Sequence, residues 1–301
     1  MKIGIPPDLV QHNQTSRTAE YMALFRAMES ARSPSRRLFH DPFARTFLRP
    51  SLRIIRNLAT IPVLGAFIPW MIDTRWPGAR SSGVARTRLV DDLLIRALQN
   101  GVEQVVILGA GFDCRAYRLA GIDRVRVIEV DHPDTQQAKC RNLRHVLGNL
   151  PNHVRFIPLD FNRQGLEEIA SASGFDGNRS TFYLWEGVTN YLTASAVEAT
   201  FRAMRRLAGK SQVLFTYIHS AVLDPETSFP GKDRLKKTLQ SAGEVWTFGF
   251  NPAELKDYLD QRGFRLVDDI GSVEYRTRYL GTHPRLLRGY EFYRVAMGIS
   301  Q

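Results

Sequence analysis

Glycine and acidic residues surround two apolar runs, and their spacing is typical of a cofactor site. Gly109 and Gly111 follow the run 105–108, and without side chains they would let a ligand lie against the backbone. Glu129 and Asp131 close the next apolar run about twenty residues later. Nucleotide-binding α/β proteins place an acid there to hydrogen-bond a ribose diol. The segment therefore predicts a site for a cofactor that contains ribose.

The residues after the glycines distinguish between two kinds of ribose-bearing cofactor. A dinucleotide site continues with a small residue that brings a helix N-terminus close to pyrophosphate. Here that position is Cys114, between Asp113 and Arg115. The carboxylate of Asp113 would repel pyrophosphate but would suit a neutral or cationic ligand. S-adenosyl-L-methionine carries a sulfonium and no phosphate, so the turn favours a methyltransferase over a dehydrogenase.

The elements that must position these residues alternate between strand and helix. Unbroken apolar runs rich in Val and Ile are typical of parallel strands that are buried on both faces. Helical patterns separate the runs, including one from about residue 84 to 100 that leads into the glycine turn. The pattern predicts an α/β fold with a doubly wound, mostly parallel sheet. We expect strands over 105–108, 125–130, 154–161, 181–185, 213–218, 264–270 and 292–297.

Two segments before the sheet predict added helical structure. Residues 15–30 place apolar side chains at helical intervals. The apolar run 61–72 would span only about 18 Å as a helix, against a hydrocarbon core of about 30 Å. We interpret this run, broken by Pro62 and Pro69, as a lid that lines a substrate pocket, with an ordinary core contact as the alternative.

The domain organisation follows from these segments. We expect an N-terminal helical cap over 1–80 and a cofactor-binding domain over 81–301 that forms one compact unit. A turn is expected at 81–83, just before the helix that leads into the glycine turn.

The composition indicates an intracellular globular protein. The chain has 301 residues, of which 44% are apolar, and this is ample for a full core. Cys114 and Cys140 offer neither a disulfide framework nor a metal-ligand cluster, and the polar start of the chain does not predict a secretion signal. We therefore expect a cytoplasmic protein without a bound metal or a transmembrane segment.

The charge of the chain bears on its partners. The formal net charge is +11, but the arginines are scattered and form no dense basic run or nucleic-acid-binding motif. We expect a basic surface that prefers a small-molecule acceptor, anionic or aromatic, and nucleic acid is disfavoured as a partner.

Several motifs in order cover most of the chain. They are TAEYMALFRAMES at 18–30, LFHDPFA at 38–44, ARTRLVDD at 85–92, LGAGFDCRAYRL at 108–119, EVDHP at 129–133, LDF at 159–161 and EGVTNYL at 186–192. In these motifs the chain resembles the leucine carboxyl methyltransferase-like family of class I S-adenosyl-L-methionine-dependent methyltransferases, which includes polyketide O-methyltransferases. One departure is Cys114, where the family usually has Thr. The resemblance implies a seven-stranded sheet with its last strand antiparallel, and an N-terminal helical cap over the acceptor pocket.

The resemblance also implies roles for individual residues at the methionine end of the cofactor. Arg86 would hold the methionine carboxylate, Gly109 and Gly111 would line the amino-acid end, and Glu186 would close this side of the site.

At the nucleoside end, the resemblance implies three further contacts. Asp131 would take the ribose hydroxyls, and Asp160 and Phe161 would flank the adenine.

The methyl acceptor in this interpretation is an oxygen of a small molecule, either a hydroxyl or a carboxylate. A carboxylate is ionised at neutral pH, whereas a phenol with a pKa of about 10 gains from a base. His219, at the end of the fifth predicted strand, is the candidate base for a hydroxyl acceptor. Tyr191, Tyr217 and His283 are further candidates for the substrate pocket.

Two alternatives to O-methylation stay open. N-methylation of protein or nucleic acid would be indicated by an acidic-Pro-Pro-aromatic motif after the fourth strand, where EGVTNYL stands instead. The other alternative is a cofactor-binding protein without turnover. The sequence does not specify the acceptor or the oligomeric state.

Overall fold

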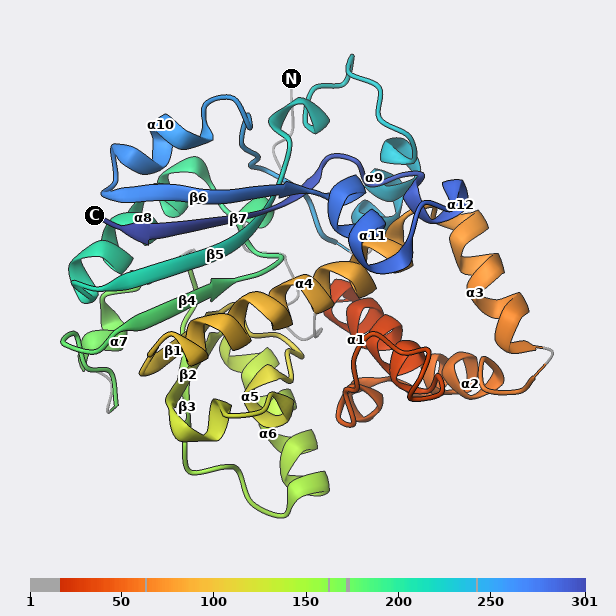
Figure 1. Ribbon diagram of the computed structural model, residues 1–301, viewed down its shortest axis with the longest axis horizontal. Coiled ribbons are helices and arrows are strands. Elements are labelled where there is room, and N and C mark those ends of the chain that lie inside the picture. Colours follow the sequence, from red (N-terminus) through yellow and green to blue (C-terminus); the bar gives the residue numbers. More distant parts are fainter. Residues whose placement is uncertain (1–16, 63, 162, 172–173, 242) are drawn as a thin grey trace, which may run out of the picture.

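A mixed sheet runs through the computed structural model, which describes residues 17–301 apart from 63, 162, 172–173 and 242. The strands are β1 (Gln104–Leu108), β2 (Arg126–Asp131), β3 (Val154–Pro158), β4 (Thr181–Trp185), β5 (Ser211–Ile218), β6 (Phe264–Gly271) and β7 (Tyr293–Ser300). Their order in the sheet is β3-β2-β1-β4-β5-β7-β6 (Figure 1). β1 to β5 pair in parallel, and β7 lies antiparallel between β5 and β6. The predicted doubly wound sheet with an antiparallel last strand is confirmed.

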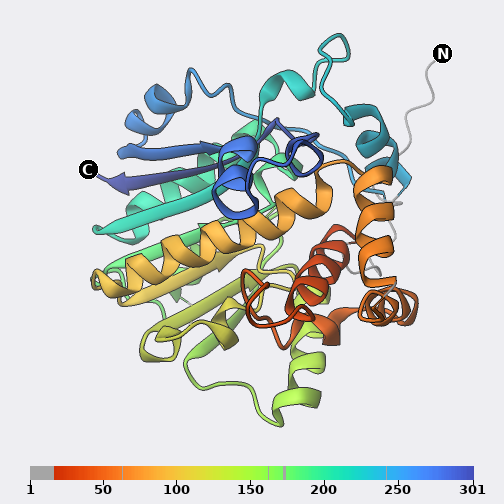
Figure 2. The same ribbon diagram turned by 45° about the vertical axis from the view of Figure 1, so that its right-hand side comes forward.

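Helices cover both faces of this sheet (Figure 2). They are α1 (Arg17–Ser30), α2 (Pro50–Leu58), α3 (Leu64–Arg75), α4 (Ala79–Gln99), α5 (Arg115–Arg118), α6 (Pro133–Leu147), α7 (Glu168–Ser171), α8 (Ala194–Leu207), α9 (Lys232–Ser241), α10 (Leu255–Asp260), α11 (Ser272–Leu280) and α12 (Pro284–Leu287). On one face, α4 and α11 build a core that includes Leu94 and Tyr275. On the other face, α8 and α10 contribute Phe201 and Leu255. Because both faces are covered, β1 and β4 are buried along their whole length.

Four short 3₁₀ helices in the described chain connect these elements. They are η2 (Ala44–Phe47), η3 (Ile122–Arg124), η4 (Thr189–Tyr191) and η5 (Ser220–Val222). η4 and η5 directly follow β4 and β5, so they lie at the carboxyl ends of parallel strands, where ligands bind in folds of this kind.

The turn that the sequence predicts at 81–83 is not formed, because α4 runs from Ala79 through these residues. Small side chains at this point serve helix packing. A Cβ on Gly83 would lie 2.7 Å from the Cε atom of Met22, so α1 and α4 approach closely there. Ser82 hydrogen-bonds the Tyr275 hydroxyl at 2.6 Å. The expected domain boundary after residue 80 therefore falls inside the first turn of α4.

The N-terminal helices lie beyond the carboxyl ends of the parallel strands (Figure 1). α1, α2, α3 and η2 share a hydrophobic cluster with Phe112 and Cys114, which directly follow the glycine turn. The Phe47 and Phe112 rings stack with centroids 4.7 Å apart. These helices thus pack against the segment that the sequence analysis assigns to the cofactor.

The apolar run 61–72 lines neither of the two described pockets, so its role as a lid stays a prediction, and Pro69 does not break its helix. α3 continues through Pro69, which was expected to break it. Proline removes one helical hydrogen bond, but Ile68 and Ile72 are buried in the N-terminal cluster and hold the helix against the protein. Among the described helices, none is long and apolar enough to cross a membrane. The expectation of no secretion signal concerns residues 1–14, which lie outside the described part of the chain.

Candidate cofactor-binding site

The carboxyl ends of β1, β2 and β3 lie side by side and carry the predicted cofactor residues. The Ala110 N–H donates to the Val130 carbonyl at 3.1 Å, and the Leu159 N–H donates to the Asp131 carbonyl at 2.8 Å. The Gly111 N–H donates to the Asp131 carboxylate. The backbone therefore brings the glycine turn, Asp131 and the segment after β3 to one edge of the sheet.

Both glycines of the turn occupy positions that require glycine. Gly109 has φ +62°, and a Cβ at this residue would lie 2.3 Å from Cγ2 of Val188. Gly111 has φ +43°, a backbone conformation that other residues rarely adopt. Val188 belongs to the segment after β4, so the turn packs directly against that segment.

The two acids at the end of β2 have different environments. Asp131 is half-buried, and its carboxylate also accepts the His132 N–H at 2.7 Å. Burial raises its pKa, although the backbone hydrogen bonds oppose the rise. Glu129 is fully buried, 2.6 Å from the Nζ atom of Lys139, and accepts the Tyr117 hydroxyl at 2.7 Å. Glu129 is therefore committed to contacts inside the protein.

A buried arginine and a half-buried glutamate meet next to the glycine turn. Arg86 Nε lies 2.7 Å from Glu186 Oε1, and the Arg86 guanidinium lies 4.7 Å from the centre of the Tyr293 ring. The other carboxylate oxygen of Glu186 accepts Arg115 Nη1 at 2.8 Å. Burial alone would raise the pKa of Glu186, but the two arginines lower it, and the carboxylate is held in its charged form.

Asp113 does not present a free carboxylate at the turn. Its side chain accepts the Arg115 N–H at 2.6 Å and also pairs with the Arg115 guanidinium. Burial would raise the pKa of Asp113, but Arg115 lowers it to about 2. The repulsion of pyrophosphate that we inferred from Asp113 is therefore offset by Arg115.

The ion pairs continue from this turn into the N-terminal helices. Arg115 Nε lies 2.8 Å from Asp91, and Arg118 pairs with the same carboxylate at 2.7 Å. Arg118 also lies 3.9 Å from Asp41, which pairs with Arg26 of α1 at 2.9 Å. All five side chains are almost fully buried. The charges thus form one connected network from α1 to the end of β4, because Arg115 also binds the carboxylate that follows β4.

Asp160 and Phe161 lie at the same edge of the sheet, just after β3. Asp160 is half-buried and pairs with Arg163 at 3.6 Å. Phe161 is half-buried and packs against the core on the α8 face. Both residues are placed near Asp131 by the backbone bond to Leu159.

A pocket of about 220 Å³ lies between η5, α9 and residues 244–247. Trp246 lines the pocket, and its ring centroid lies 6.5 Å from that of Tyr293. Glu244 also lines it and accepts the Tyr191 hydroxyl at 3.2 Å. Tyr191 therefore lies next to this pocket. From the pocket, Trp246 packs near Tyr293, and Tyr293 lies under the Arg86 guanidinium.

His219 directly follows β5, and its ring makes a local hydrogen bond. Its Nδ1 atom accepts the Ala221 N–H at 3.1 Å, while its backbone N–H donates to the Phe292 carbonyl at 2.8 Å. Since Nδ1 uses its lone pair as an acceptor, the proton of a neutral ring lies on Nε2. In this tautomer Nε2 can donate a hydrogen bond but cannot accept a proton.

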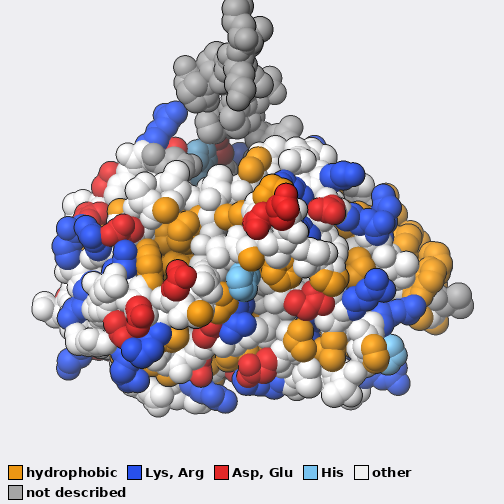
Figure 3. Space-filling model, turned by 90° about the horizontal axis from the view of Figure 1, so that it is seen from above, with side chains coloured by type: hydrophobic (Ala, Val, Ile, Leu, Met, Phe, Trp, Pro, Cys, Tyr) orange, Lys and Arg blue, Asp and Glu red, His pale blue; other side chains and the backbone are white. Residues whose placement is uncertain are grey.

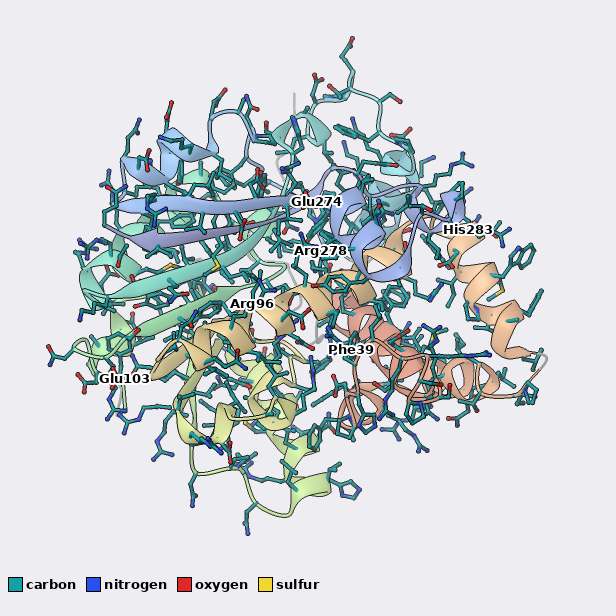
Figure 4. All side chains as sticks on the ribbon, in the orientation of Figure 1. Phe39, Arg96, Glu103, Glu274, Arg278 and His283 are labelled. Carbon is teal, nitrogen blue, oxygen red and sulfur yellow. The ribbon has the colours of Figure 1, made fainter. Side chains whose placement is uncertain are left out.

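Two residues predicted for the substrate pocket lie elsewhere. Tyr217 is fully buried in the core, and its hydroxyl lies 2.9 Å from the carboxylate of Asp269, so it reaches no pocket. His283 is exposed at the start of α12, where Nδ1 accepts the Arg285 N–H at 3.3 Å, and it lies near α3 at the outside of the molecule (Figure 4). The sequence placed both near strand or helix ends without showing which way they face.

The sequence analysis assigned no role to Arg115, Asp91 or Tyr293. For Asp91 a signal existed, because it lies among apolar residues on the helix that the pattern predicts before the glycine turn. For Arg115 a signal also existed, because it lies inside the motif at 108–119 that predicts the cofactor turn. Tyr293 had no such signal, since its strand is far away in the sequence.

Two further observations concern possible metal sites and a second hollow. None of their His, Cys, Asp and Glu side chains gather in groups of three or more that could hold a metal ion. A second hollow, of about 490 Å³, is lined by residues 116–124 and by His153. It lies near the amino ends of β2 and β3 and is remote from the glycine turn.

Comparison with known proteins identifies a related family. The family model for leucine carboxyl methyltransferases matches residues 19–205. A relative from Mycolicibacterium gilvum is 32% identical over 208 residues, covering 69% of this chain and 67% of the relative. A relative from Mycobacterium tuberculosis is 31% identical over 252 residues, covering 80% and 73%. Both carry the name "Putative S-adenosyl-L-methionine-dependent methyltransferase".

Solved structures share the fold. A "putative methyltransferase" from Thermobifida fusca superposes with a TM-score of 0.61 at 16% identity, covering 98% of both chains. A DUF574 family protein from Streptomyces avermitilis gives a TM-score of 0.58 at 12% identity, covering 96% of this chain and 99% of the other. With the strand order described above, these likenesses support the class I methyltransferase fold.

Proposed function

The chain belongs to the leucine carboxyl methyltransferase family and is an S-adenosyl-L-methionine-dependent methyltransferase, and we propose that it methylates an oxygen of a small molecule. The pair of Arg86 and Glu186 carries the proposal, because it places one buried cation and one half-buried anion next to the glycine turn. The carboxylate and ammonium of an amino acid require such a pair of groups. In this proposal Arg86 binds the methionine carboxylate and Glu186 the ammonium.

The remaining cofactor contacts follow the order of the strands. Gly109 and Gly111 provide backbone without side chains beside the amino-acid end of the cofactor. A Cβ at either residue would narrow the space beside this turn. Asp131 accepts the ribose hydroxyls, and Asp160 and Phe161 flank the adenine. When bound, S-adenosyl-L-methionine supplies an electrophilic methyl group on a sulfonium.

Asp113 and Glu129 take indirect parts in this proposal. Asp113 holds the Arg115 guanidinium against Glu186, and Glu129 neutralises Lys139 beneath the end of β2. We assign both a positioning role, because Glu129 is only 1% exposed and Asp113 is held by both the N–H and the guanidinium of Arg115.

We favour a carboxylate over a hydroxyl as the acceptor because of His219. A hydroxyl acceptor gains from a base, and Nε2 of His219 carries the proton while Nδ1 accepts the Ala221 N–H. A carboxylate is ionised at neutral pH and needs no base. Lys236, at the rim of the pocket beside Trp246, would attract an anionic acceptor. In this proposal Nε2–H of His219 donates to the acceptor.

The N-terminal helices have a separate role in the proposal. In this proposal α1, α2, α3 and η2 form a cap whose hydrophobic cluster packs on Phe112 and Cys114, and this cap excludes water from the methionine end of the site. The methyltransferase domain then comprises the sheet and the helices that cover its two faces.

Calorimetric titration with S-adenosyl-L-methionine tests the cofactor contacts. We expect Arg86→Ala and Asp131→Ala each to weaken binding by at least about ten-fold, because each removes a buried or half-buried charged partner. Arg278→Ala removes an exposed arginine that pairs with Glu274 and serves as the control. Binding by Arg86→Ala as tight as that of the unaltered protein would exclude the assigned role.

A panel of carboxylic acids, phenols and amines tests the acceptor. We expect methyl esters from carboxylic acids, and a rate that His219→Asn changes by less than about ten-fold, whereas loss of a general base costs about 10²- to 10⁴-fold. Asn retains a side-chain oxygen that can accept the Ala221 N–H. Methylation of phenols with a large loss in the variant would instead support a hydroxyl acceptor. N-methylated products, or tight cofactor binding without any turnover, would refute O-methylation.

A further inference from the structure

Exposed large apolar side chains concentrate in the segment that contains α2 and α3. In the described chain thirteen large hydrophobic side chains are exposed, and seven of them lie between residues 54 and 76. Six of these form what we call the hairpin face: Ile54, Leu58, Ile61, Phe67, Trp70 and Met71. Such a concentration marks an interaction surface, because single exposed hydrophobic residues are normally scattered.

The hairpin face is the outer side of helices whose inner side is packed on the protein. α2 buries Leu52, and α3 buries Ile68 and Ile72, all in the N-terminal cluster. Phe67 and Trp70 are 50% and 43% exposed, and their ring centroids are 5.6 Å apart. The aromatic pair therefore lies on the solvent side of α3, whose opposite side packs on the protein.

Basic side chains border this apolar face. The segment 44–75 contains five arginines, at positions 45, 49, 53, 56 and 75, and one acid, Asp73, which pairs with Arg80 at 2.5 Å. In the part of the chain that the structure describes, Arg45, Arg53 and Arg75 form no ion pair. Figure 3 shows the apolar side chains gathered at the right-hand edge of the molecule, with Lys and Arg side chains beside them.

Arginines also lie next to the aromatic side chains of α3. The Arg285 guanidinium of α12 lies 5.8 Å from the centre of the Trp70 ring. Arg234 of α9 donates to the Arg75 carbonyl at 2.7 Å, which brings a further basic helix to the end of α3. The border of the hairpin face is therefore positive on more than one side.

We propose that the hairpin face docks on the surface of an anionic lipid bilayer. Phe67, Trp70 and Met71 enter the boundary between headgroups and acyl chains, and the arginines contact lipid phosphates. A helix of this length lies on the membrane and does not cross it, which agrees with the lack of a membrane-spanning helix among the described residues. A second copy of the chain fits the face less well, because a two-fold contact would bring the same arginines together.

Sedimentation with vesicles tests this proposal on the full chain. We expect binding to vesicles of equal parts phosphatidylcholine and phosphatidylglycerol, little binding to phosphatidylcholine alone, and weaker binding when salt is raised from 0.1 to 0.5 M. The double variant Phe67→Ser/Trp70→Ser should lower the partition coefficient by at least about ten-fold, since two aromatic side chains lose apolar burial.

A matched control separates docking from general surface hydrophobicity. Val267→Ser/Val273→Ser removes two apolar side chains that are 41% and 42% exposed on β6 and α11, and it should bind vesicles as the unaltered protein does. Unchanged calorimetric affinity of both variants for S-adenosyl-L-methionine shows that they are folded.

Three results would overturn the proposal. They are absence of binding to the anionic vesicles, equal binding by the Phe67→Ser/Trp70→Ser variant, and a dimer in analytical ultracentrifugation that this variant dissociates. The last result would assign the hairpin face to a second copy of the chain.

Discussion

Replacing Arg115 by Met tests whether the buried ion-pair network stabilises the fold. Arg115 binds Asp91, Asp113 and Glu186, and its side chain is 4% exposed. Asp91 keeps Arg118 and Glu186 keeps Arg86, but Asp113 loses the guanidinium that pairs with it. Removing one partner of a buried ion pair costs about 3–5 kcal/mol, and we expect the free energy of unfolding to fall by this amount at neutral pH.

The pKa of Asp113 accounts for part of this loss and gives it a pH dependence. Burial raises the pKa, but Arg115 lowers it to about 2, against 3.8 for an ordinary Asp. The difference corresponds to about 2 kcal/mol of stability, which is present above pH 3.8 and lost as the pH falls through about 2. In Arg115→Met we expect the pKa of Asp113 to rise, because burial then acts without the cation that opposes it most strongly. The charged form of Asp113 then lowers the free energy of unfolding. This loss is largest at neutral pH and becomes smaller as the pH falls toward the raised pKa.

Urea unfolding at pH 7.5 and pH 4.5 measures both effects. The control is Arg202→Met, which removes the same charge from a pair with Glu198 in which the arginine side chain is 65% exposed. Exposed pairs contribute little, so we expect a loss below about 1 kcal/mol in the control. The stability difference between the unaltered protein and Arg115→Met should be smaller at pH 4.5 than at pH 7.5. A loss below about 1 kcal/mol in Arg115→Met, or the same loss at both pH values, would refute the reasoning.

Three further substitutions have defined outcomes. Gly109→Ala places a methyl group 2.3 Å from Val188 in a backbone with φ +62°, and calorimetry should show at least about ten-fold weaker cofactor binding. Tyr217→Phe removes a hydroxyl bound to Asp269; urea unfolding should show a loss of about 1 kcal/mol while cofactor affinity stays unchanged, and a large fall in affinity would contradict its place in the core. Thr193→Ala removes the N-cap of α8 and should cost about 1 kcal/mol in the same assay, whereas no loss would contradict the cap.

The sheet could be predicted from sequence because its signals are local. The run 105–108 and the run 181–185 are uniformly apolar, and both strands are buried on both faces. Gly109 and Gly111 are an equally clear signal, because both have a left-handed backbone and Gly109 lies close to another segment. The strand predictions depend on a few consecutive residues, and the glycines are local signals of the turn between strand and helix.

The charged part of the site could not be predicted in the same way. The sequence predicts a carboxylate at Asp113 that would repel pyrophosphate, but it does not show that the neighbouring Arg115 pairs with both Asp113 and Glu186. His219 was assigned as a base from its place at a strand end, but the local turn decides which nitrogen keeps the proton. The direction of a side chain and the partner it meets depend on contacts between distant segments.

The insertion of β7 between β5 and β6 also determines when the cofactor site can form. Ile218 of β5 pairs with Tyr293 of β7, so this contact closes across the whole of α9 to α12 and β6. A chain is synthesised from its N-terminus, so β7 emerges after the other six strands of this sheet. Tyr293 is also the ring under the Arg86 guanidinium. During synthesis the contact between Arg86 and Tyr293 therefore forms only after β7 has emerged. The site reaches its final geometry when the sheet is complete.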